Sequence, residues 1–251
     1  MYVLKIGGNE IDQPEFLAGL ATAVRTLNAA GQRGVIVHGG GKEIAMGLQR
    51  HGLDFEIVDG MRATSPAAMA VVEQVLSGAV NKRLVAQLNA ADVLAIGLSG
   101  VDLHLLQTTP MRPEGRDLGR VGEVVAVRAE VLRLLLAQGW LPVVSPVSVD
   151  QEDQGPTNVN ADHAALAIAT ALQADELIFV SNVPGVMIDG AVVPRLTPGQ
   201  IEQHIATEAI GGGMVPKVRS AVGALAGVQA VRITNLEGLR SGTGTQIAEG
   251  A

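Results

Sequence analysis

The chain of 251 residues contains 47% hydrophobic but only 2% aromatic residues, and its formal net charge is -7. This length can bury the core of one large domain or two small ones. An acidic, aromatic-poor chain argues against a nucleic-acid partner, which needs a basic surface and stacking side chains. The sequence contains no cysteine, which excludes disulfides, thiolate catalysis and cysteine-ligated zinc.

Strand-like and helix-like patterns alternate along the chain. Apolar runs predict strands at 1–8, 34–38, 93–98, 103–109, 121–127, 140–145, 176–181 and, as the last strand, 229–234. Apolar residues at helical spacing predict helices at 12–31, behind a capping box of Asp12 and Glu15, and at 42–50, 65–84, 131–138, 163–172, from 197 onward, and 214–226. Residues 150–158 are predicted to form a loop.

This alternation predicts an α/β fold, and the nearly continuous apolar strands indicate a sheet that is buried on both faces. No long linker, repeat or low-complexity segment interrupts the pattern. We place the best division near residue 172, between two lobes, 1–172 and 173–251, that share one sheet.

Two strands end in glycines. Gly7 and Gly8 follow the first strand, and Gly39, Gly40 and Gly41 follow the strand at 34–38. Bare backbone N–H groups beside a helix start can hold an anion. A tight turn without a ligand explains one such segment equally well, and the second segment favours the anion site.

The basic residues are divided unevenly into four lysines and fourteen arginines. A retained lysine is more often needed for its compact ammonium group, which the planar guanidinium of arginine does not imitate. Lys5, Lys42 and Lys217 all lie next to glycines, although each could also be a simple surface charge.

Several common signatures are missing from the sequence. It contains no P-loop motif, no nucleophile elbow, no complete dinucleotide-binding fingerprint, and no histidines at metal-ligand spacing. The remaining candidates for a functional site are two glycine-rich turns, the glycine-flanked Lys5 and Lys217, and Asp162 at a polar helix start. Phosphoryl transfer between two anions needs such groups, because donor and acceptor charges about 4 Å apart repel by roughly 4 kcal/mol at an effective dielectric near 20.

The sequence resembles the amino acid kinase family. The matching segments cover nearly the whole chain and are Lys5-Ile6-Gly7-Gly8, Val37-His38-Gly39-Gly40-Gly41, Gly60-Met61-Arg62-Ala63-Thr64, Val80-Asn81-Lys82, Gly97-Leu98-Ser99-Gly100, 119–125, Asn158-Val159-Asn160-Ala161-Asp162, Val183-Pro184-Gly185-Val186 and Gly212-Gly213-Met214-Val215-Pro216-Lys217. Each segment alone is a weak signal, but the set is specific.

The resemblance implies a three-layer αβα sandwich with a mostly parallel open sheet, in which the N-terminal lobe holds an acyl amino acid and the C-terminal lobe holds MgATP. It implies phosphorylation of the side-chain carboxylate of N-acetylglutamate, a step of arginine biosynthesis. By similarity, Lys5 and Lys217 would stabilise the transferring phosphoryl group and Asp162 would orient both ammonium groups. The implied backbone donors are Gly7, Gly8, Gly40 and Gly41.

The resemblance also assigns the two substrates. Arg62 would pair with a substrate carboxylate, which a guanidinium fork matches bidentately, although a surface arginine at a helix start is the alternative. Asn158 would hold the acetamido group beside Gly40 and Gly41. The implied ATP-binding residues are Ser181, Asn182, Val183, Gly185, Met187, Ile210 and Gly211, with Mg²⁺ held mainly by the ATP phosphates and no metal site in the protein itself.

The sequence departs from the family pattern at two positions. Asn182 stands where many members have Asp, and Lys42 follows the glycines where Pro is frequent, so Lys42 is interpreted as a surface charge. Because the sequence begins directly at its first strand, feedback inhibition by arginine and hexamer formation are not expected. We expect a cytoplasmic homodimer with no membrane contact.

Two other functions remain open. The first is a kinase for aminoadipate or glutamate attached to a small acidic carrier protein in lysine or arginine biosynthesis, for which Arg112, Arg116 and Arg120 could form a basic rim. The second is a non-catalytic regulator on the same fold, against which the retention of both lysines and Asp162 argues.

Overall fold

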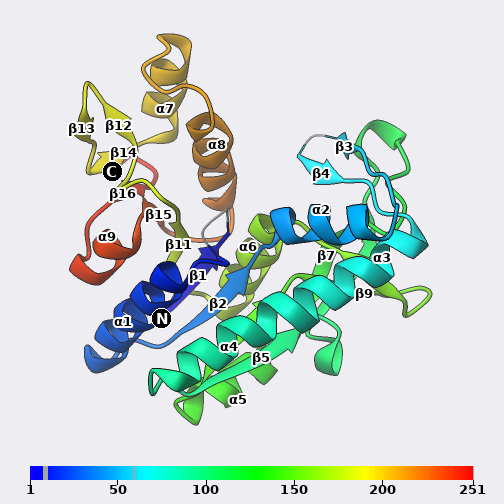
Figure 1. Ribbon diagram of the computed structural model, residues 1–251. Helices are drawn as coiled ribbons and strands as arrows, with labels where there is room; N and C mark the ends of the chain where they lie inside the picture. The colour runs from blue at the N-terminus through cyan, green and yellow to red at the C-terminus, as the bar shows by residue number, and fades with distance from the viewer. Residues whose placement is uncertain (8–10, 59, 251) are drawn as a thin grey trace.

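The computed structural model describes residues 1–7, 11–58 and 60–250. Its centre is an eight-stranded sheet in which neighbouring strands are parallel, except for the pair β15 and β16 (Figure 1). In spatial order the strands are β14 (Arg195–Leu196), β16 (Thr245–Ile247), β15 (Val231–Thr234), β11 (Glu176–Val180), β1 (Tyr2–Ile6), β2 (Gly34–His38), β8 (Leu141–Ser145) and β5 (Ala95–Ser99).

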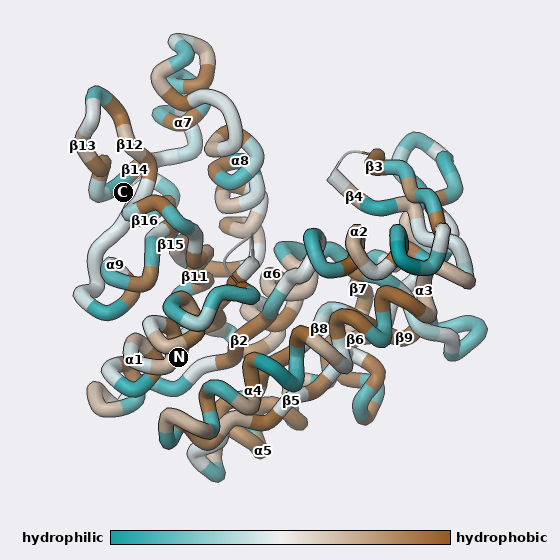
Figure 2. The backbone as a smooth tube through the Cα atoms, in the orientation of Figure 1, coloured by the Kyte–Doolittle hydropathy of each residue, from teal (hydrophilic) through white to brown (hydrophobic). Residues whose placement is uncertain are grey.

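Helices cover both faces of this sheet. One face packs against α1 (Pro14–Ala29), α4 (Asn81–Ala90) and α9 (Leu236–Ser241), and the other against α5 (Ala129–Ala137), α6 (Ala161–Leu172), α7 (Pro198–Ala206) and α8 (Met214–Ala224). The hydrophobic colouring of Figure 2 follows the central strands, which lie between the two helix layers. This arrangement confirms the predicted αβα sandwich with a mostly parallel sheet.

A second, four-stranded sheet has the order β10-β9-β6-β7. It comprises β10 (Pro156–Asn158), β9 (Val147–Asp150), β6 (Leu106–Pro110) and β7 (Gly122–Val127). The predicted strand pair is confirmed as β6 and β7, which are antiparallel, although the start of the predicted strand at 103–109 lies in a 3₁₀ segment and not in β6. The prediction of a loop throughout 150–158 is wrong at its end, because β10 pairs with β9 there. A three-residue strand that contains proline has no sequence periodicity to reveal it.

Two short hairpins complete the strands. The hairpin of β3 (Ile57–Val58) and β4 (Met61–Arg62) precedes the long helix, and the hairpin of β12 (Met187–Ile188) and β13 (Ala191–Val192) follows β11. Two single-turn 3₁₀ segments occupy Asp102–His104 and Pro113–Gly115.

The long helix predicted to begin at Ser65 is present, but it has three parts. The hydroxyl of Ser65 accepts a hydrogen bond from the N–H of Ala68, and α3 (Pro66–Glu73) then passes into a π-helical segment, η1 (Gln74–Val80), before α4. A π-helical segment often lies at a functional site because it re-aims the side chains that follow it. Here the next residue is Asn81, which is completely buried.

The structure corrects two further predictions. Asp12 and Glu15 form no capping box, because α1 begins at Pro14 behind Gln13, which makes no side-chain cap. Asp12 instead accepts a hydrogen bond from Lys42 at the start of α2 (Gly41–Arg50). The strand at 229–234 is not the last one, since Thr245–Ile247 adds β16 from a short segment that the glycines around it concealed.

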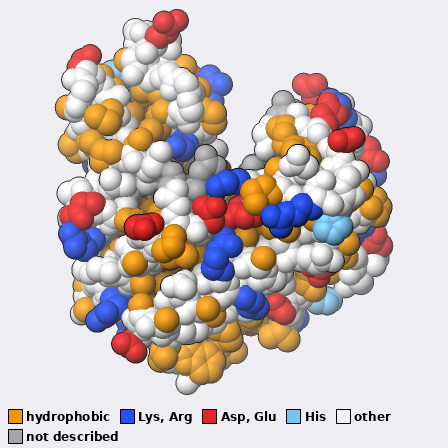
Figure 3. Space-filling view, viewed as in Figure 1, with side chains coloured by type: hydrophobic (Ala, Val, Ile, Leu, Met, Phe, Trp, Pro, Cys, Tyr) orange, Lys and Arg blue, Asp and Glu red, His pale blue; other side chains and the backbone are white. Residues whose placement is uncertain are grey.

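One face of the molecule is hollowed between the part that carries α7 and α8 and the part that carries β3 and β4 (Figure 3). Charged side chains of both signs gather at the foot of this hollow. Within the described ranges, no helix is both long and apolar enough to cross a membrane.

Candidate active site

Lys5 reaches the site because side chains alternate along a strand. Val3 on β1 belongs to the core beneath α6, so Lys5, two residues later, points to the same face. Its Nζ lies 2.7 Å from the Oδ1 of Asp162, and the two side chains are 22% and 28% exposed. The predicted lysine and carboxylate therefore form a partly buried ion pair.

Asp162 is held at this position by the start of α6. The side chain of Asn160 caps the helix, and its Oδ1 accepts a 2.7 Å hydrogen bond from the N–H of Asp162. A carboxylate in the first turn is favoured by the helix dipole. Local sequence thus fixes the carboxylate, while the strand order brings Lys5 to it.

The two glycine-rich turns lie side by side because β1 and β2 are parallel neighbours, with Ile6 opposite His38. The N–H of Gly39 donates to the carbonyl of Ile6 at 2.9 Å. A Cβ atom on Gly39 would lie 3.8 Å from the Cα of Gly7, and one on Gly7 would lie 3.3 Å from Nζ of Lys5. Gly8, the other predicted backbone donor of this turn, is outside the described residues.

Gly40 and Gly41 lead into α2. A Cβ atom on Gly40 would come within 2.7 Å of Leu76 in η1, so the turn is packed closely against the π-helical segment. Gly41 is the first residue of α2, and its carbonyl accepts a 3.1 Å hydrogen bond from Nη2 of Arg62. The predicted substrate-binding arginine is thus tied to the second glycine-rich turn.

Arg62 and Asn158 are also linked through Thr64, whose role the sequence did not reveal. The hydroxyl of Thr64 donates to the carbonyl of Arg62 at 2.6 Å and accepts from Nδ2 of Asn158 at 3.1 Å. Thr64 is only 1% exposed. Because its Nδ2 is engaged, the amide of Asn158 has its oxygen left to accept a hydrogen bond from a ligand.

These groups line one cavity of about 260 Å³. Its predicted members are Lys5, Gly7, Gly40, Gly41, Arg62, Asn158 and Asp162. The cavity is therefore suited to a small anionic ligand, because it is lined by two cationic side chains, a carboxylate, an amide and glycine backbone.

Known protein families and relatives agree with this geometry. The model of the amino acid kinase family matches residues 1–235. This chain belongs to the amino acid kinase family. It is 54% identical over 241 residues to the acetylglutamate kinase of Chloroflexus aggregans, an alignment that covers 96% of this chain and 94% of the relative.

Solved structures support the same fold. The structure of smu.665 from Streptococcus mutans superposes with a TM-score of 0.83 at 33% identity, and covers 99% of this chain and 98% of that one. The carbamate kinase of Giardia lamblia bound to AMP-PNP superposes with a TM-score of 0.68 at 17% identity, with coverage of 99% and 98%. The second likeness concerns the fold alone.

In this amino acid kinase the second predicted catalytic lysine, Lys217, does not line the cavity that contains Lys5. Lys217 is half-buried near the start of α8, beyond ion-pair distance of Asp162. Helix α8 stands on the opposite side of the hollow from β3 and β4 (Figure 1). The structure therefore pairs Asp162 with Lys5, and the expected contact of Asp162 with both ammonium groups is not present in this arrangement.

The predicted ATP-binding residues lie at the end of β11 and on the segments that follow it. Ser181 directly follows β11, Met187 in β12 is 44% exposed, and Gly211 is exposed in the connection between α7 and α8. Ile210 is 3% exposed and belongs to the core, so its side chain is not available to a ligand.

Thr245 in β16, to which the sequence analysis assigned no role, organises this region. It is completely buried, its hydroxyl donates to the carbonyl of Val193 at 2.7 Å, and it accepts from the N–H of Val186 at 2.8 Å. A Cβ atom on Gly185 would meet this hydroxyl at 2.7 Å. The loop that contains Asn182, Val183 and Gly185 is therefore held against β16.

Behind the second glycine-rich turn, His38 is completely buried and burial lowers its pKa to about 4. Its Nδ1 lies 2.9 Å from the carbonyl of Gly39, and its Nε2 lies 3.1 Å from Nδ2 of Asn81. Because an amide nitrogen can only donate, Nε2 accepts and the ring is neutral with its proton on Nδ1. Lys82 donates to the Oδ1 of the same asparagine at 3.1 Å.

Lys42 is an exposed side chain, as the sequence suggested, but it has a partner. Its Nζ lies 3.0 Å from Oδ2 of Asp12, and this hydrogen bond lowers the pKa of the aspartate. The next residue, Glu43, pairs with Arg83 of α4 at 3.0 Å. These pairs connect the start of α2 to the segment before α1 and to α4.

Two of the three arginines considered as a basic rim, Arg116 and Arg120, are engaged in ion pairs. Arg116 contacts both carboxylate oxygens of Glu56 at 2.7 and 2.8 Å, and Arg120 contacts both oxygens of Asp153 at 2.6 and 3.2 Å. These pairs reduce the positive charge that the rim could offer to an acidic carrier.

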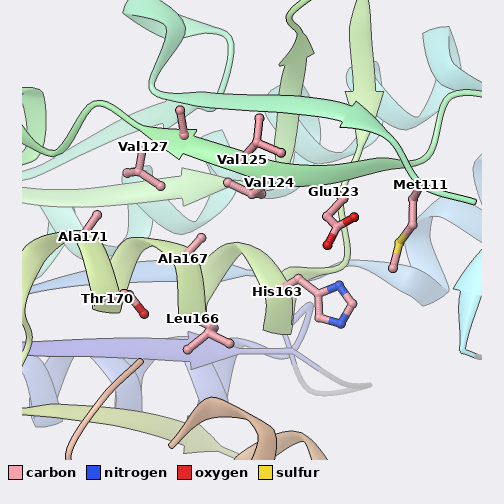
Figure 4. A pocket seen from close by; sticks show the side chains of 11 residues that line it. Met111, Glu123, Val124, Val125, Val127, His163, Leu166, Ala167, Thr170 and Ala171 are labelled. Carbon is pink, nitrogen blue, oxygen red and sulfur yellow. The ribbon is translucent and has the colours of Figure 1, made fainter. Parts of the chain in front are cut away.

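A separate, mostly aliphatic groove lies between β7 and α6 (Figure 4). His163, the neighbour of Asp162, lines this groove together with Glu123, and so lies on a different side of α6 from the Lys5 pair. Within the described part of the chain, no three His, Asp or Glu side chains are grouped to hold a metal ion.

Proposed function

We propose that this protein catalyses the ATP-dependent phosphorylation of the side-chain carboxylate of N-acetyl-L-glutamate to an acyl phosphate, a reaction of arginine biosynthesis. The observation that carries the proposal is the single cavity in which the ion pair of Lys5 and Asp162 lies beside Arg62, Asn158 and the glycine-rich turns. The 54% identity to an acetylglutamate kinase over nearly the full length supports it.

The substrate would be held at both ends. Arg62 would bind the α-carboxylate, because Arg62 lines the cavity and a guanidinium offers paired N–H donors that match a carboxylate. Asn158 would accept a hydrogen bond from the acetamido N–H through its amide oxygen, for which no donor is found among the described residues. The side-chain carboxylate would then point toward Lys5 and the glycine-rich turns.

In the proposed reaction a side-chain carboxylate oxygen attacks the γ-phosphorus of ATP, an O–P bond forms, and the bond from that phosphorus to the bridging oxygen of ADP breaks. The carboxylate is ionised at neutral pH, so no general base is needed. Lys5 and the backbone N–H groups of Gly7, Gly8, Gly40 and Gly41 would offset the charge on the transferring group. Asp162 would orient the ammonium group of Lys5.

ATP would bind in the C-terminal lobe, 173–251, and the acyl amino acid in the N-terminal lobe, 1–172. The proposed contacts for ATP are Ser181, Asn182, Val183, Gly185, Met187, Gly211 and, through its backbone, Ile210. Mg²⁺ would enter on the ATP phosphates and supply further positive charge. Lys217, on the ATP side of the hollow, would reach the transferring phosphoryl group from the side opposite Lys5.

We also propose that the protein is a cytoplasmic homodimer. Among the described residues, β5 is the terminal strand of the main sheet and pairs with β8 alone, and an edge strand is a natural site for pairing. Large apolar side chains near it are exposed, namely Leu94 (64%), Leu103 (66%) and Trp140 (42%). Light scattering coupled to size-exclusion chromatography would test this, and a monomer mass would refute it.

The function is tested by steady-state assays with ATP and either N-acetylglutamate or carrier-linked aminoadipate. Hydroxylamine converts an acyl phosphate to a hydroxamate, which reports the product directly. We expect turnover with free N-acetylglutamate. Turnover with the carrier-linked substrate alone would establish the alternative kinase, and binding of N-acetylglutamate without turnover would establish the regulator.

A further inference from the structure

We infer that Phe55, which lies outside the substrate cavity, is a positioning residue that orients the guanidinium of Arg62 toward the substrate carboxylate. The inference rests on the proposed function, because it concerns the same carboxylate contact. It begins from a stacking contact, in which the central guanidinium carbon of Arg62 lies 3.7 Å from the centroid of the Phe55 ring. A cation at this distance is attracted to the negative face of the ring.

The guanidinium is held from two directions. Its central carbon lies over the Phe55 ring, and the carbonyl of Gly41 accepts a hydrogen bond from Nη2 at 3.1 Å. These two contacts restrict both the position of the guanidinium and its rotation. The remaining N–H groups are therefore set in a defined direction before any substrate binds.

One of those remaining groups is unsatisfied. Nη1 of Arg62 is buried and has no hydrogen-bond partner among the residues that the structure describes. Arg62 lines the cavity that also contains Asn158 and Lys5. A buried donor without a partner is unfavourable, so the site is arranged for a ligand that supplies an acceptor, and a carboxylate does so.

Phe55 does not line that cavity. It lines a separate groove of about 540 Å³ along the outer side of α2, together with Met46 and Lys42. The ring is 40% exposed, so it does not belong to the hydrophobic core. Its position between this outer groove and Arg62 indicates that it acts on the substrate through the arginine and not by contact.

Stacking also affects the solvation of the arginine. Arg62 is half-buried, and burial lowers its pKa from the ordinary value of an arginine. An aromatic face is one of the few neighbours that can cover a guanidinium without removing its charge or occupying its N–H groups. The ring therefore leaves the charge to act on the substrate and occupies none of the N–H groups.

The test compares the wild-type protein with Phe55→Leu, Phe55→Trp and the control Met46→Ala. Leucine keeps an apolar side chain but removes the ring, tryptophan offers a stronger aromatic face, and Met46 is 41% exposed in the same outer groove. For each protein, kcat, the KM for N-acetylglutamate and the KM for ATP are measured. Calorimetric titration gives the Kd for N-acetylglutamate independently of turnover.

We expect Phe55→Leu to raise the KM and Kd for N-acetylglutamate about 2- to 5-fold, which is the range of a partly exposed cation–π contact, with kcat and the KM for ATP unchanged. Phe55→Trp should match or improve on the wild type, and Met46→Ala should equal it. An unchanged Kd in Phe55→Leu would overturn the inference, as would equal increases in both KM values.

The remaining outcomes separate the two proposals. Wild-type protein that binds N-acetylglutamate without turnover would refute the kinase function, and the Kd of Phe55→Leu would still decide the positioning role. If wild-type protein does not bind N-acetylglutamate, both proposals fail. If Phe55→Leu does not fold, a several-fold weaker Kd in Phe55→Trp would overturn the inference, and an equal or tighter one would support it.

Discussion

Replacement of Asp162 by asparagine tests the centre of the proposed mechanism. Asp162→Asn keeps the shape of the side chain but removes the charge that lies 2.7 Å from Nζ of Lys5. At that separation two unit charges attract by roughly 6 kcal/mol at an effective dielectric near 20. Both side chains are partly exposed, so solvent screens this attraction, and about 1.5–3 kcal/mol, between the ranges for exposed and for buried ion pairs, is the better guide.

If the carboxylate serves to orient Lys5 in the transition state, this free energy is lost from catalysis. We expect kcat of Asp162→Asn to fall about 10- to 150-fold, with the KM for N-acetylglutamate changed much less. Steady-state kinetics with both substrates varied would measure this. Glu130→Gln is the matched control, because Glu130 forms an ion pair of 3.3 Å with Arg128 on the surface, where it is 66% exposed.

Two results would refute this reasoning about Asp162. A kcat within threefold of the wild type would show that the ion pair does not position the lysine for catalysis. A large increase in the KM for N-acetylglutamate with kcat unchanged would place the carboxylate in ground-state binding instead. Either result would leave the family membership intact and change only the role of the pair.

Further substitutions probe binding, catalysis, packing and pH dependence. Lys217→Ala should lower kcat far more than it weakens ATP binding, because its contact should strengthen in the transition state. Thr64→Val removes a hydroxyl that links the two substrate-binding side chains and should raise the KM for N-acetylglutamate about 3- to 10-fold. Gly34→Ala should lower the free energy of unfolding by about 1–3 kcal/mol, because a methyl group there would overlap the ring of Tyr2. Burial lowers the pKa of His38 to about 4. Below about pH 6.5 the histidine of the unfolded chain therefore binds a proton that the folded chain does not bind. The free energy of unfolding should fall by up to about 3 kcal/mol as the pH drops from 6.5 to 4.

Each of these expectations has a result or a control variant that tests it. Equal losses in kcat and in ATP affinity would contradict the transition-state role of Lys217, and an unchanged KM in Thr64→Val would remove the hydroxyl from substrate binding. Gly223→Ala in α8, where a Cβ atom meets nothing within 4 Å, should not destabilise the fold in urea. His38→Gln lacks the titrating ring, so urea unfolding of this variant should depend less on pH between 6.5 and 4 than that of the wild type.

The sequence predicted the parts of the site that depend on local pattern. Gly7 and Gly39 end apolar strands, and Asp162 begins a helix, so each could be placed by its neighbours in the chain. Arg62 and Asn158 were found through the resemblance to a family, because no periodicity marks them. The structure places these groups in one cavity, as the motif set implied.

Contacts between distant segments could not be predicted in the same way. The bridge through Thr64, the stacking of Phe55 on Arg62 and the pair of Lys42 with Asp12 each join segments that only the folded chain brings together. Asp12 shows the difficulty: its position suggested a helix cap, but a long-range ion pair uses its carboxylate instead. Local sequence predicts the contact of an acidic side chain only where no charged partner from another segment competes for it.

The topology itself explains why the site lies where it does. β1 lies in the middle of the main sheet, between β2 on one side and β11 on the other, and both neighbours are parallel to it. The connection from β1 to β2 runs through α1 on one face, whereas the connection that enters β11 runs through α6 on the opposite face. At such a point the loops at the carboxyl ends of the strands diverge and leave a crevice. Lys5, near the end of β1, points to the α6 side of that crevice, and this is why its partner is the first acidic residue of α6 and not one of α1.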